Sequence, residues 1–255
     1  MLKKYELSIE DHHELIKECK KYKINFLSSP FDIFSAKLLH NLGLKLYKIP
    51  SSEITNIPYL EFIGSLQKKI ILSTGMSTLK EIELAINVLK NFGTSNVSIL
   101  HCNTEYPTPF EHVNLRVLDT LKKKFNLPVG YSDHTVGITV PIAAVSFGAE
   151  IIEKHFTLDK SFDGPDHLAS LNPSELIKMV KEIRNVEKCL GSDKKTPTSS
   201  ESKNINVARK SIVAKTNIKK GEFFTEKNIT TKRPGYGLSP LYWHKILNTK
   251  SANDY

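Results

Sequence analysis

The sequence predicts an α/β fold: a (β/α)8 barrel that lacks its first two strands, followed by a small β-rich domain. Short apolar runs recur along residues 1–191 with amphipathic segments between them, which is the pattern of repeated βα units. No GxGxxG or GxxxxGK[ST] loop follows any run, so the pattern favours a barrel over a doubly wound nucleotide-binding sheet. The predicted strands are 24–27, 44–49, 70–72, 97–100, 128–130 and 151–152.

Capping residues mark the helices between these strands. In a capping box, a side chain at the helix start and an acidic side chain three residues later bind each other's backbone amides. Gly93 and Gly191 are placed to end two of the helices, and the weakly polar stretch 136–149 predicts a buried helix. The capping pairs are Ser8 and Asp11, Thr78 and Glu81, and Asn172 and Glu175.

A closed barrel needs eight strands, and this chain begins with a helix that no strand precedes. We therefore expect the first βαβ portion to lie outside this sequence, so that the chain is a fragment, a truncated reading frame or a split gene product. Because an open barrel exposes sheet edges and an apolar interior, we expect the chain by itself to be poorly soluble.

Composition is that of a globular protein: 255 residues, 40% hydrophobic and 25% charged. The net charge of +9 comes mainly from lysine, and only four residues are arginine, which argues against base-reading contacts; no nucleic-acid partner is expected. Three widely spaced cysteines form neither a zinc pair nor a disulfide framework. With no apolar stretch long enough for a membrane helix and no signal peptide, the expected location is the cytoplasm.

The tail is organised differently from the repeats. Residues 192–204 are rich in Ser, Thr and Lys and predict a linker between a barrel domain at 1–191 and a second domain at 205–255. Short strands and tight turns are expected at 211–214, 219–221, 223–224 and 233–237. Because about 45 residues seldom hold a stable core alone, this domain is expected to pack against the barrel or a partner subunit.

Polar residues follow every predicted strand. In a parallel barrel these positions converge on one face, where catalytic residues of such folds lie. Capping alone needs one Ser, Thr, Asp or Asn per helix and does not account for the lysines, glutamates and histidines present. The strand ends carry Ser28 to Asp32; Lys48, Ser51 and Glu53; Ser73 to Gly75; His101, Asn103, Thr104 and Tyr106; Ser132 to His134; and Glu153 to His155.

His134 and His155 end consecutive strands, so both imidazoles are expected to face one pocket and share a divalent cation. Two histidines leave coordination positions open for water and a substrate oxygen, as in a Lewis-acid site. The alternative is that each is an ordinary hydrogen-bonded histidine. Their shared strand-end position favours the metal hypothesis.

A set of hydroxyl donors and one ammonium group suits a phosphate or carboxylate, because it supplies charge-assisted hydrogen bonds without a nucleotide loop. For any single serine, capping at the strand end is the favoured explanation. Asp133 and Asp166 are expected to hold a polyol, orient a histidine or solvate a loop, and Cys102 to be a small buried thiol. The proposed donors are Ser29, Lys48, Ser51, Ser73 and Ser132.

Six motifs occur in order: KIPSSEITNIPYLE (48–61), ILSTGMST (71–78), LHCNTEYPTPFEHVNL (100–115), VGYSDHTVG (129–137), IIEKHFTLD (151–159) and DGPDHLASL (163–171). They resemble bacterial sialic acid synthases, which make N-acetylneuraminate or its relative legionaminate. ARKSIVA (208–214) and KKGEFFTEKNITTKRPGYG (219–237) resemble the antifreeze-like (SAF) domain that ends those enzymes. The resemblance implies metal-dependent condensation of phosphoenolpyruvate with an open-chain N-acylmannosamine, releasing phosphate.

The same resemblance implies a role for each site residue. Manganese would sit on His134 and His155, and Glu53 would act beside it as an acid, base or sugar ligand. Arg233 would enter a partner's active site, which implies a domain-swapped homodimer. The substrates would be held by Lys48, Ser51, Ser73 and Ser132, with Ser29 where family members often have threonine, and by Tyr106 and Asp166.

Synthases that the chain resembles begin with one strand bearing an active-site glutamate and a second bearing a lysine, and neither strand is present here. We therefore expect the chain by itself to be inactive. Two other interpretations stay open: a barrel that makes an octulosonate or heptulosonate phosphate, against which the SAF-like tail argues, and a sugar-binding remnant. The motifs do not distinguish N-acetylmannosamine from its diacetylated 6-deoxy relative, nor one divalent metal from another.

Overall fold

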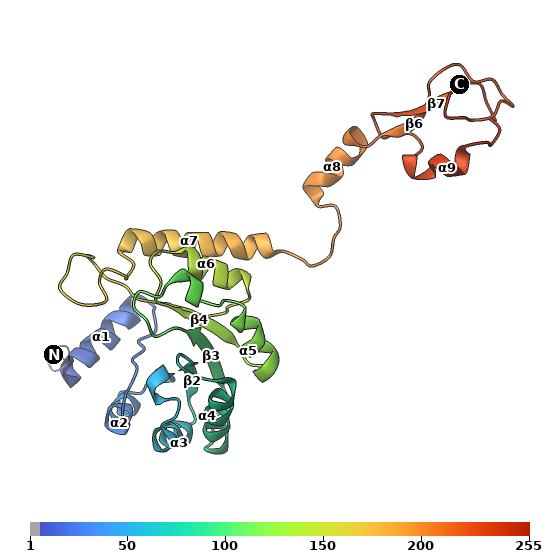
Figure 1. Cartoon of the computed structure of the whole chain (residues 1–255). Coiled ribbons are helices and arrows are strands. Elements are labelled where there is room, and N and C mark those ends of the chain that lie inside the picture. Colours follow the sequence, from blue (N-terminus) through green and yellow to red (C-terminus); the bar gives the residue numbers. More distant parts are fainter. Residues whose placement is uncertain (1–5) are drawn as a thin grey trace. The chain divides into compact units, whose positions relative to one another are not determined.

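The computed structural model describes residues 6–255, which divide into two compact units with the boundary between Gly191 and Ser192 (Figure 1). The first unit alternates helices and strands. Its elements are α1 (Ile9–Lys21), α2 (Ile33–Asn41), β1 (Leu46–Ile49), the 3-10 turn η2 (Ser51–Glu53), α3 (Ile57–Ser65), β2 (Lys69–Ser73), α4 (Leu79–Asn91), β3 (Val97–Cys102), η3 (Phe110–His112), α5 (Val117–Phe125), β4 (Val129–Asp133), α6 (Thr139–Ser146), β5 (Ile152–Lys154) and α7 (Pro173–Leu190).

The strands of the first unit form one parallel sheet in the order β1-β2-β3-β4-β5. The sheet is curled into a half-barrel, and the helices between its strands lie along its outer side (Figure 1). Each crossover passes through a helix, as parallel neighbours require. The fold is therefore the open (β/α) barrel that the sequence predicted.

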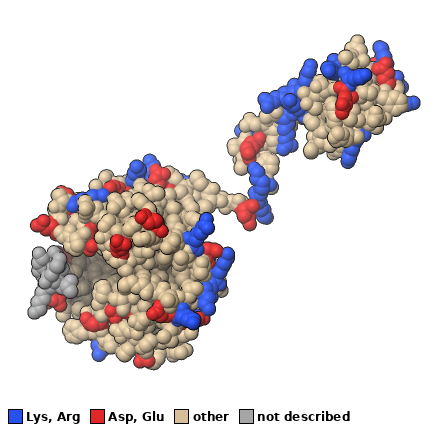
Figure 2. All heavy atoms as spheres, in the orientation of Figure 1, with Lys and Arg blue, Asp and Glu red and all other residues tan. Residues whose placement is uncertain are grey.

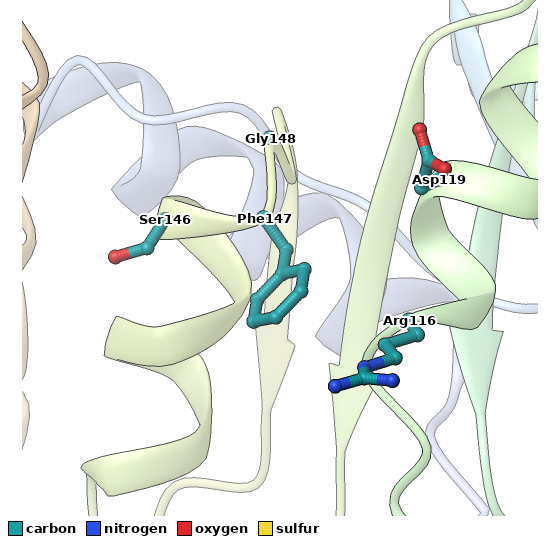
Figure 3. Close-up of a pocket in the computed structure, with 5 residues that line it drawn as sticks. All are labelled: Arg116, Asp119, Ser146, Phe147 and Gly148. Carbon is teal, nitrogen blue, oxygen red and sulfur yellow. The ribbon is translucent and has the colours of Figure 1, made fainter.

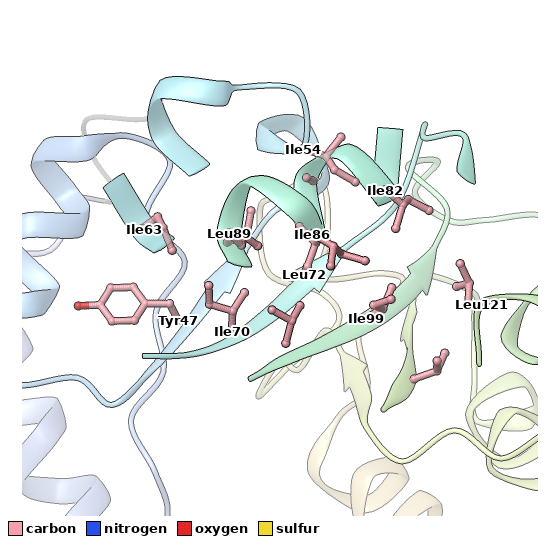
Figure 4. Close-up of a cluster of buried hydrophobic side chains, with 14 of the residues drawn as sticks. Tyr47, Ile54, Ile63, Ile70, Leu72, Ile82, Ile86, Leu89, Ile99 and Leu121 are labelled. Atoms are coloured by element: carbon pink, nitrogen blue, oxygen red, sulfur yellow. The ribbon is translucent and has the colours of Figure 1, made fainter. Parts of the chain in front are cut away.

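The core lies between the sheet and the helices. Because side chains alternate between the two faces of a strand, every second strand residue points outward against a helix. Figure 4 shows these residues meeting the apolar faces of α3 and α4. The cluster includes Tyr47, Ile70, Leu72 and Ile99 from the strands and Ile63, Ile82, Ile86 and Leu89 from the helices, all at most 3% exposed.

The predicted helix starts are confirmed. Ser8, Thr78 and Asn172 cap α1, α4 and α7, and each forms a complete capping box with the acidic residue three positions later. Gly93 follows α4 with φ +110°, a left-handed conformation that favours glycine, and Gly191 caps the end of α7. The stretch predicted as a buried helix contains α6.

The prediction of a strand at 24–27 is wrong. The segment makes no ladder with β1, and within residues 6–255 it has no other strand beside it. Its side chains are also partly solvent-facing, with Ile24 62% and Leu27 38% exposed. An apolar run becomes a strand only when neighbouring backbone bonds to it, and β1 is an edge of this sheet instead.

The second unit is small and mixed. Of the strands and turns expected in the tail, the strand at 211–214 is present, 223–224 forms only an isolated bridge between Phe223 and Lys250, and 233–237 is a bend after a strand. The segment expected to be a linker, 192–204, contains the start of a capped helix. β6 and β7 pair antiparallel, with Ser211 opposite Lys232. The elements are α8 (Ser199–Ala208), β6 (Ser211–Ala214), β7 (Ile229–Lys232), η4 (Pro240–Tyr242) and α9 (Trp243–Ile246).

Surface charge is unevenly spread. Figure 2 shows Lys and Arg side chains gathered over α8 and the rest of the second unit, where few acidic side chains are visible. On the first unit both signs are interspersed (Figure 2). Among the helices of residues 6–255, none combines the length and apolarity that crossing a bilayer requires.

Gly130 tests the packing inside the half-barrel. A Cβ at this inward-facing position would lie 2.6 Å from Leu100 Cδ2 and 2.7 Å from Ile151 Cβ, closer than packed carbons approach. We expect Gly130→Ala to lower the free energy of unfolding by about 1–3 kcal/mol, because neighbouring strands must shift. Urea unfolding measures this change. The control Asn87→Ala, on the exposed face of α4, should change it by less than about 0.5 kcal/mol.

Candidate active site at the carboxyl ends of the strands

A cleft of about 440 Å³ opens where the carboxyl ends of the five strands converge. Most of the predicted substrate and metal residues line it: Ser29, Lys48, Ser51, Ser73, Tyr106, Ser132, His134 and His155. Its other lining residues are Phe31, Pro50, Ser52, Met76, Cys102, Thr104 and Glu153.

Strand alternation explains which residues reach the cleft. The last inward-facing residue of each strand is polar or carries sulfur, whereas the outward-facing residues before it belong mostly to the apolar core. Cys102 is paired in register with Ser132, and Ser132 with Glu153, so the three side chains lie side by side. The inward set is Lys48 (β1), Ser73 (β2), Cys102 (β3), Ser132 (β4) and Glu153 (β5).

The ammonium group of Lys48, on the edge strand β1, is paired with a carboxylate from the opposite edge strand, β5. Lys48 Nζ lies 3.1 Å from Glu153 Oε1, and the same oxygen accepts a hydrogen bond of 2.7 Å from Ser132 Oγ. The Lys48 side chain is 8% exposed, and that of Glu153 is 40% exposed. A largely buried ammonium group paired with a partly solvated carboxylate keeps strong attraction for a second anion.

Ser73 presents a hydroxyl with nothing to bind. The residue is 3% exposed, and its Oγ has no hydrogen-bond partner within the described chain. Buried polar atoms are nearly always paired, so an unpaired one in a cleft indicates a ligand position. Its neighbours are satisfied: Ser51 Oγ accepts from the Gly75 amide at 2.9 Å and lies 3.3 Å from Cys102 Sγ. Cys102 is a buried free thiol, as predicted.

His134 is held as a neutral ligand. Its Nδ1 lies 2.6 Å from the Asn103 carbonyl oxygen, and because a carbonyl only accepts, Nδ1 carries the proton and Nε2 keeps its lone pair. Burial lowers the pKa of His134, an effect that the Asn103 hydrogen bond opposes and His155 reinforces. The imidazole is therefore neutral at pH 7, which is the form that binds a metal.

His155 faces His134 across the cleft. The two ring centroids lie 5.4 Å apart in an edge-on arrangement, and the Tyr106 ring lies 4.0 Å from His134 and 5.6 Å from His155. His155 Nδ1 is 3.9 Å from Asp166 Oδ2, which is too long for a direct hydrogen bond. The structure thus brings together the two histidines, the tyrosine and the aspartate that the sequence assigned to one site.

The donor set fits a divalent cation with open positions. Two imidazoles at this separation, one with its tautomer fixed by a carbonyl, match the second-shell arrangement of metal-binding histidines. Nowhere in residues 6–255 do three or more His, Cys, Asp or Glu side chains gather as a complete ligand set. A cation here would therefore need oxygen ligands from water and substrate.

Three predicted residues lie outside the cleft lining. The Glu53 carboxylate accepts hydrogen bonds from Asn56 Nδ2 at 2.6 Å and from Ser52 Oγ at 3.1 Å in the turn before α3. Asp166 approaches the cleft only through His155. Arg233 follows β7 in the second unit and is exposed; its contribution to a partner's cleft stays a prediction. The roles assigned to Glu53 and Asp166 also stay predictions.

Sequence reasoning left Glu153 and Asn103 out of the site residues. Glu153 stands in the IIEKHFTLD motif beside the selected His155, and the period-two alternation of a strand identifies it as inward-facing. Asn103 acts through its backbone carbonyl, for which no side-chain pattern exists.

A second hollow, of about 530 Å³, lies between α5 and α6 (Figure 3). Arg116 and Asp119 from the start of α5 line one side, and residues 146–148 at the end of α6 line the other. None of the strand-end residues contributes to it. The cleft is therefore where the candidate chemistry lies.

Together these observations define a (β/α)-barrel protein with a polar cleft that contains a buried lysine and a histidine pair, and with an appended small domain. The comparisons with known proteins agree: residues 1–195 match the NeuB family, and residues 209–254 match the SAF domain. This chain belongs to the NeuB family of sialic acid-type synthases, with a C-terminal SAF domain.

Three relatives illustrate the match. The chain is 54% identical to the N,N'-diacetyllegionaminic acid synthase of Campylobacter jejuni, over 100% of this chain and 77% of that protein. It is 36% identical to human N-acetylneuraminate-9-phosphate synthase, over 98% and 71%. The crystal structure of N-acetylneuraminic acid synthetase from Leptospira borgpetersenii in complex with citrate superposes with a TM-score of 0.74 at 38% identity, covering 78% of this chain and 70% of that one.

Ser73 and Ser132 should respond oppositely to loss of their hydroxyls. Ser73→Ala removes an unpaired buried group, so in phosphate-free buffer the free energy of unfolding should stay unchanged or rise by up to about 1 kcal/mol. Ser132→Ala breaks the bond to Glu153 and should lower it by about 1 kcal/mol. Urea titrations of both variants measure the difference. Equal losses in the two would show that the Ser73 hydroxyl has a partner in solution.

Proposed function

We propose that this protein is a synthase of the legionaminate branch, which condenses phosphoenolpyruvate with the diacetylated 6-deoxy relative of N-acetylmannosamine and releases phosphate. The observation that carries the proposal is the anion site: the buried Lys48 ammonium beside the unpaired Ser73 hydroxyl. The choice of branch is supported by the 54% identity to an N,N'-diacetyllegionaminic acid synthase.

The residues around the anion site account for substrate binding. Lys48 supplies a positive charge whose attraction for phosphate or carboxylate is screened little, because the side chain is largely buried. Ser73 donates its free hydroxyl, and Ser132 can turn its hydroxyl from Glu153 to a bound anion. Binding of phosphoenolpyruvate thus replaces the contacts that Glu153 makes in the unliganded cleft.

The reaction joins the C3 carbon of phosphoenolpyruvate to the aldehyde carbon of the sugar. Water then adds at C2, and phosphate leaves with cleavage of its bond to C2. A divalent cation, which we propose to be Mn²⁺ held by His134 and His155, would polarise the aldehyde oxygen. Glu153, released from Lys48, lies within the cleft to take the proton of the attacking water. The Tyr106 ring packs against His134 and lies edge-on to His155 at the rim of the cleft.

N-acetylneuraminate synthesis from N-acetylmannosamine is the second candidate. The human relative at 36% identity is named for the 9-phosphate of N-acetylneuraminate, so the family accepts more than one sugar. Turnover with each of the two sugars decides between the candidates.

Lys48 carries the first test. Lys48→Met keeps the length of the side chain and removes its charge, so the Kd for phosphoenolpyruvate should rise about 10- to 100-fold, the loss of a hydrogen-bonded charge pair. Isothermal titration calorimetry measures it. The control Lys69→Met removes the same charge at the opposite end of β2, where the side chain is exposed, and should leave the Kd within about twofold. A similar rise in Kd in both variants would show that Lys48 acts only through the net charge of the protein and does not contact the ligand.

Turnover carries the second test. Phosphate release from phosphoenolpyruvate with Mn²⁺ is expected to be faster, by about tenfold or more in kcat/KM, with the diacetylated sugar than with N-acetylmannosamine. The assay is run on this chain by itself and with the N-terminal strands of a relative supplied. Release only with the added strands fits the expected inactivity of the chain alone. Faster release with N-acetylmannosamine would assign the protein to the N-acetylneuraminate branch.

A further inference from the structure

The residues directly before the two candidate metal ligands form a buried ion pair. Asp133 ends β4 and Lys154 ends β5, and the two residues are partners in the register of the sheet. His134 and His155 are the next residues along each strand. Lys154 Nζ lies 2.6 Å from Asp133 Oδ2, and the side chains are 3% and 0% exposed.

The pair also holds the backbone that follows His134. Asp133 Oδ1 accepts a hydrogen bond of 3.0 Å from the Thr135 amide, and Lys154 Nζ donates to the Thr135 carbonyl oxygen. Both backbone polar groups of Thr135 are therefore bound to the ion pair, and His134 lies between the bound residues. Thr135 itself is fully buried.

The ion pair is on the opposite face of the strands from the cleft. Ser132 and Glu153 point into the cleft, so the next residues, Asp133 and Lys154, point toward the helices, and neither lines the cleft. Lys160 and Glu175 lie near this face and form their own ion pair at 2.7 Å. The Asp133–Lys154 pair thus does not face the cleft.

A buried ion pair is a poor source of stability, because the desolvation of two charges offsets their attraction. What this pair supplies is geometry: it ties the ends of β4 and β5 together where the histidines begin. Asp133 was expected from the sequence to hold a polyol, orient a histidine or solvate a loop; its carboxylate binds Lys154 and the Thr135 amide, so a role toward a histidine stays a prediction.

We propose that Lys154 is a positioning residue for the divalent cation: its pairing with Asp133 and its bond to Thr135 set the spacing and orientation of His134 and His155. This inference rests on the metal site of the proposed function and adds a residue to it. Loosening the pair should weaken metal binding by the 10- to 100-fold typical of groups that support metal ligands.

The experiment measures Mn²⁺ affinity of the unliganded protein by water-proton relaxation, together with urea unfolding. Lys154→Met leaves a buried carboxylate unpaired. The double variant Asp133→Asn/Lys154→Met is therefore measured as well. It retains an oxygen acceptor for the Thr135 amide and leaves no unpaired charge at these two positions. Lys160→Met is the matched control, since it breaks the neighbouring Lys160–Glu175 pair on the same side of the molecule. Mn²⁺ affinity should fall about 10- to 100-fold in the double variant and change less than twofold in Lys160→Met.

The outcomes separate this inference from the proposed metal site. His134→Ala must abolish Mn²⁺ binding; if it does not, both the metal site and the role of Lys154 are overturned. If His134→Ala abolishes binding but the folded double variant binds Mn²⁺ as the parent does, only the role of Lys154 is overturned. A loss of affinity in proportion to lost stability, shared by Lys160→Met, would also overturn it, because a purely structural pair has that signature.

Discussion

The alternation of side chains along five parallel strands is the constraint on which the rest of this structure depends. Outward residues such as Tyr47, Leu72 and Ile99 must be apolar, because they are sealed against helices, and the inward residue at each strand end is free to be polar. Because the strands are parallel, all inward ends meet on one side. A shift of register by one residue would place the core side chains in the cleft and Lys48 in the core.

The cleft concentrates polar groups at the edge of an apolar core, where each charge requires a partner. Lys48 is matched by Glu153, Lys154 by Asp133, and the His134 ring by a backbone carbonyl. Among the residues that line the cleft, Ser73 has a buried hydroxyl with no hydrogen-bond partner within residues 6–255. An unpaired buried donor beside a charged amine leaves a place for a ligand that accepts hydrogen bonds from both.

Two ion pairs involve neighbouring residues of β5, and they lie on opposite faces of the sheet. Glu153, facing inward and partly solvated, holds Lys48 in a way that an incoming anion can replace. Lys154, one residue later and facing outward, is out of reach of solvent and substrate. Glu153 therefore makes a contact that a ligand can replace, and Lys154 makes one that stays buried, because strand alternation puts the two residues in different surroundings.

The sequence by itself determined the βα repeat, the capped helices and the set of strand-end residues, because capping and periodicity are local properties of the chain. It also indicated the NeuB family through six ordered motifs. It did not determine that residues 24–27 stay outside the sheet, which depends on neighbouring backbone. Only the tertiary structure decided that Ser73 is left without a partner within the described residues, that Glu153 pairs with Lys48, and that Asp133 and Lys154 meet beneath the histidines. The two pairings join residues on different strands, 21 residues apart for Asp133 and Lys154, and no local pattern in the sequence encodes the register that brings them together.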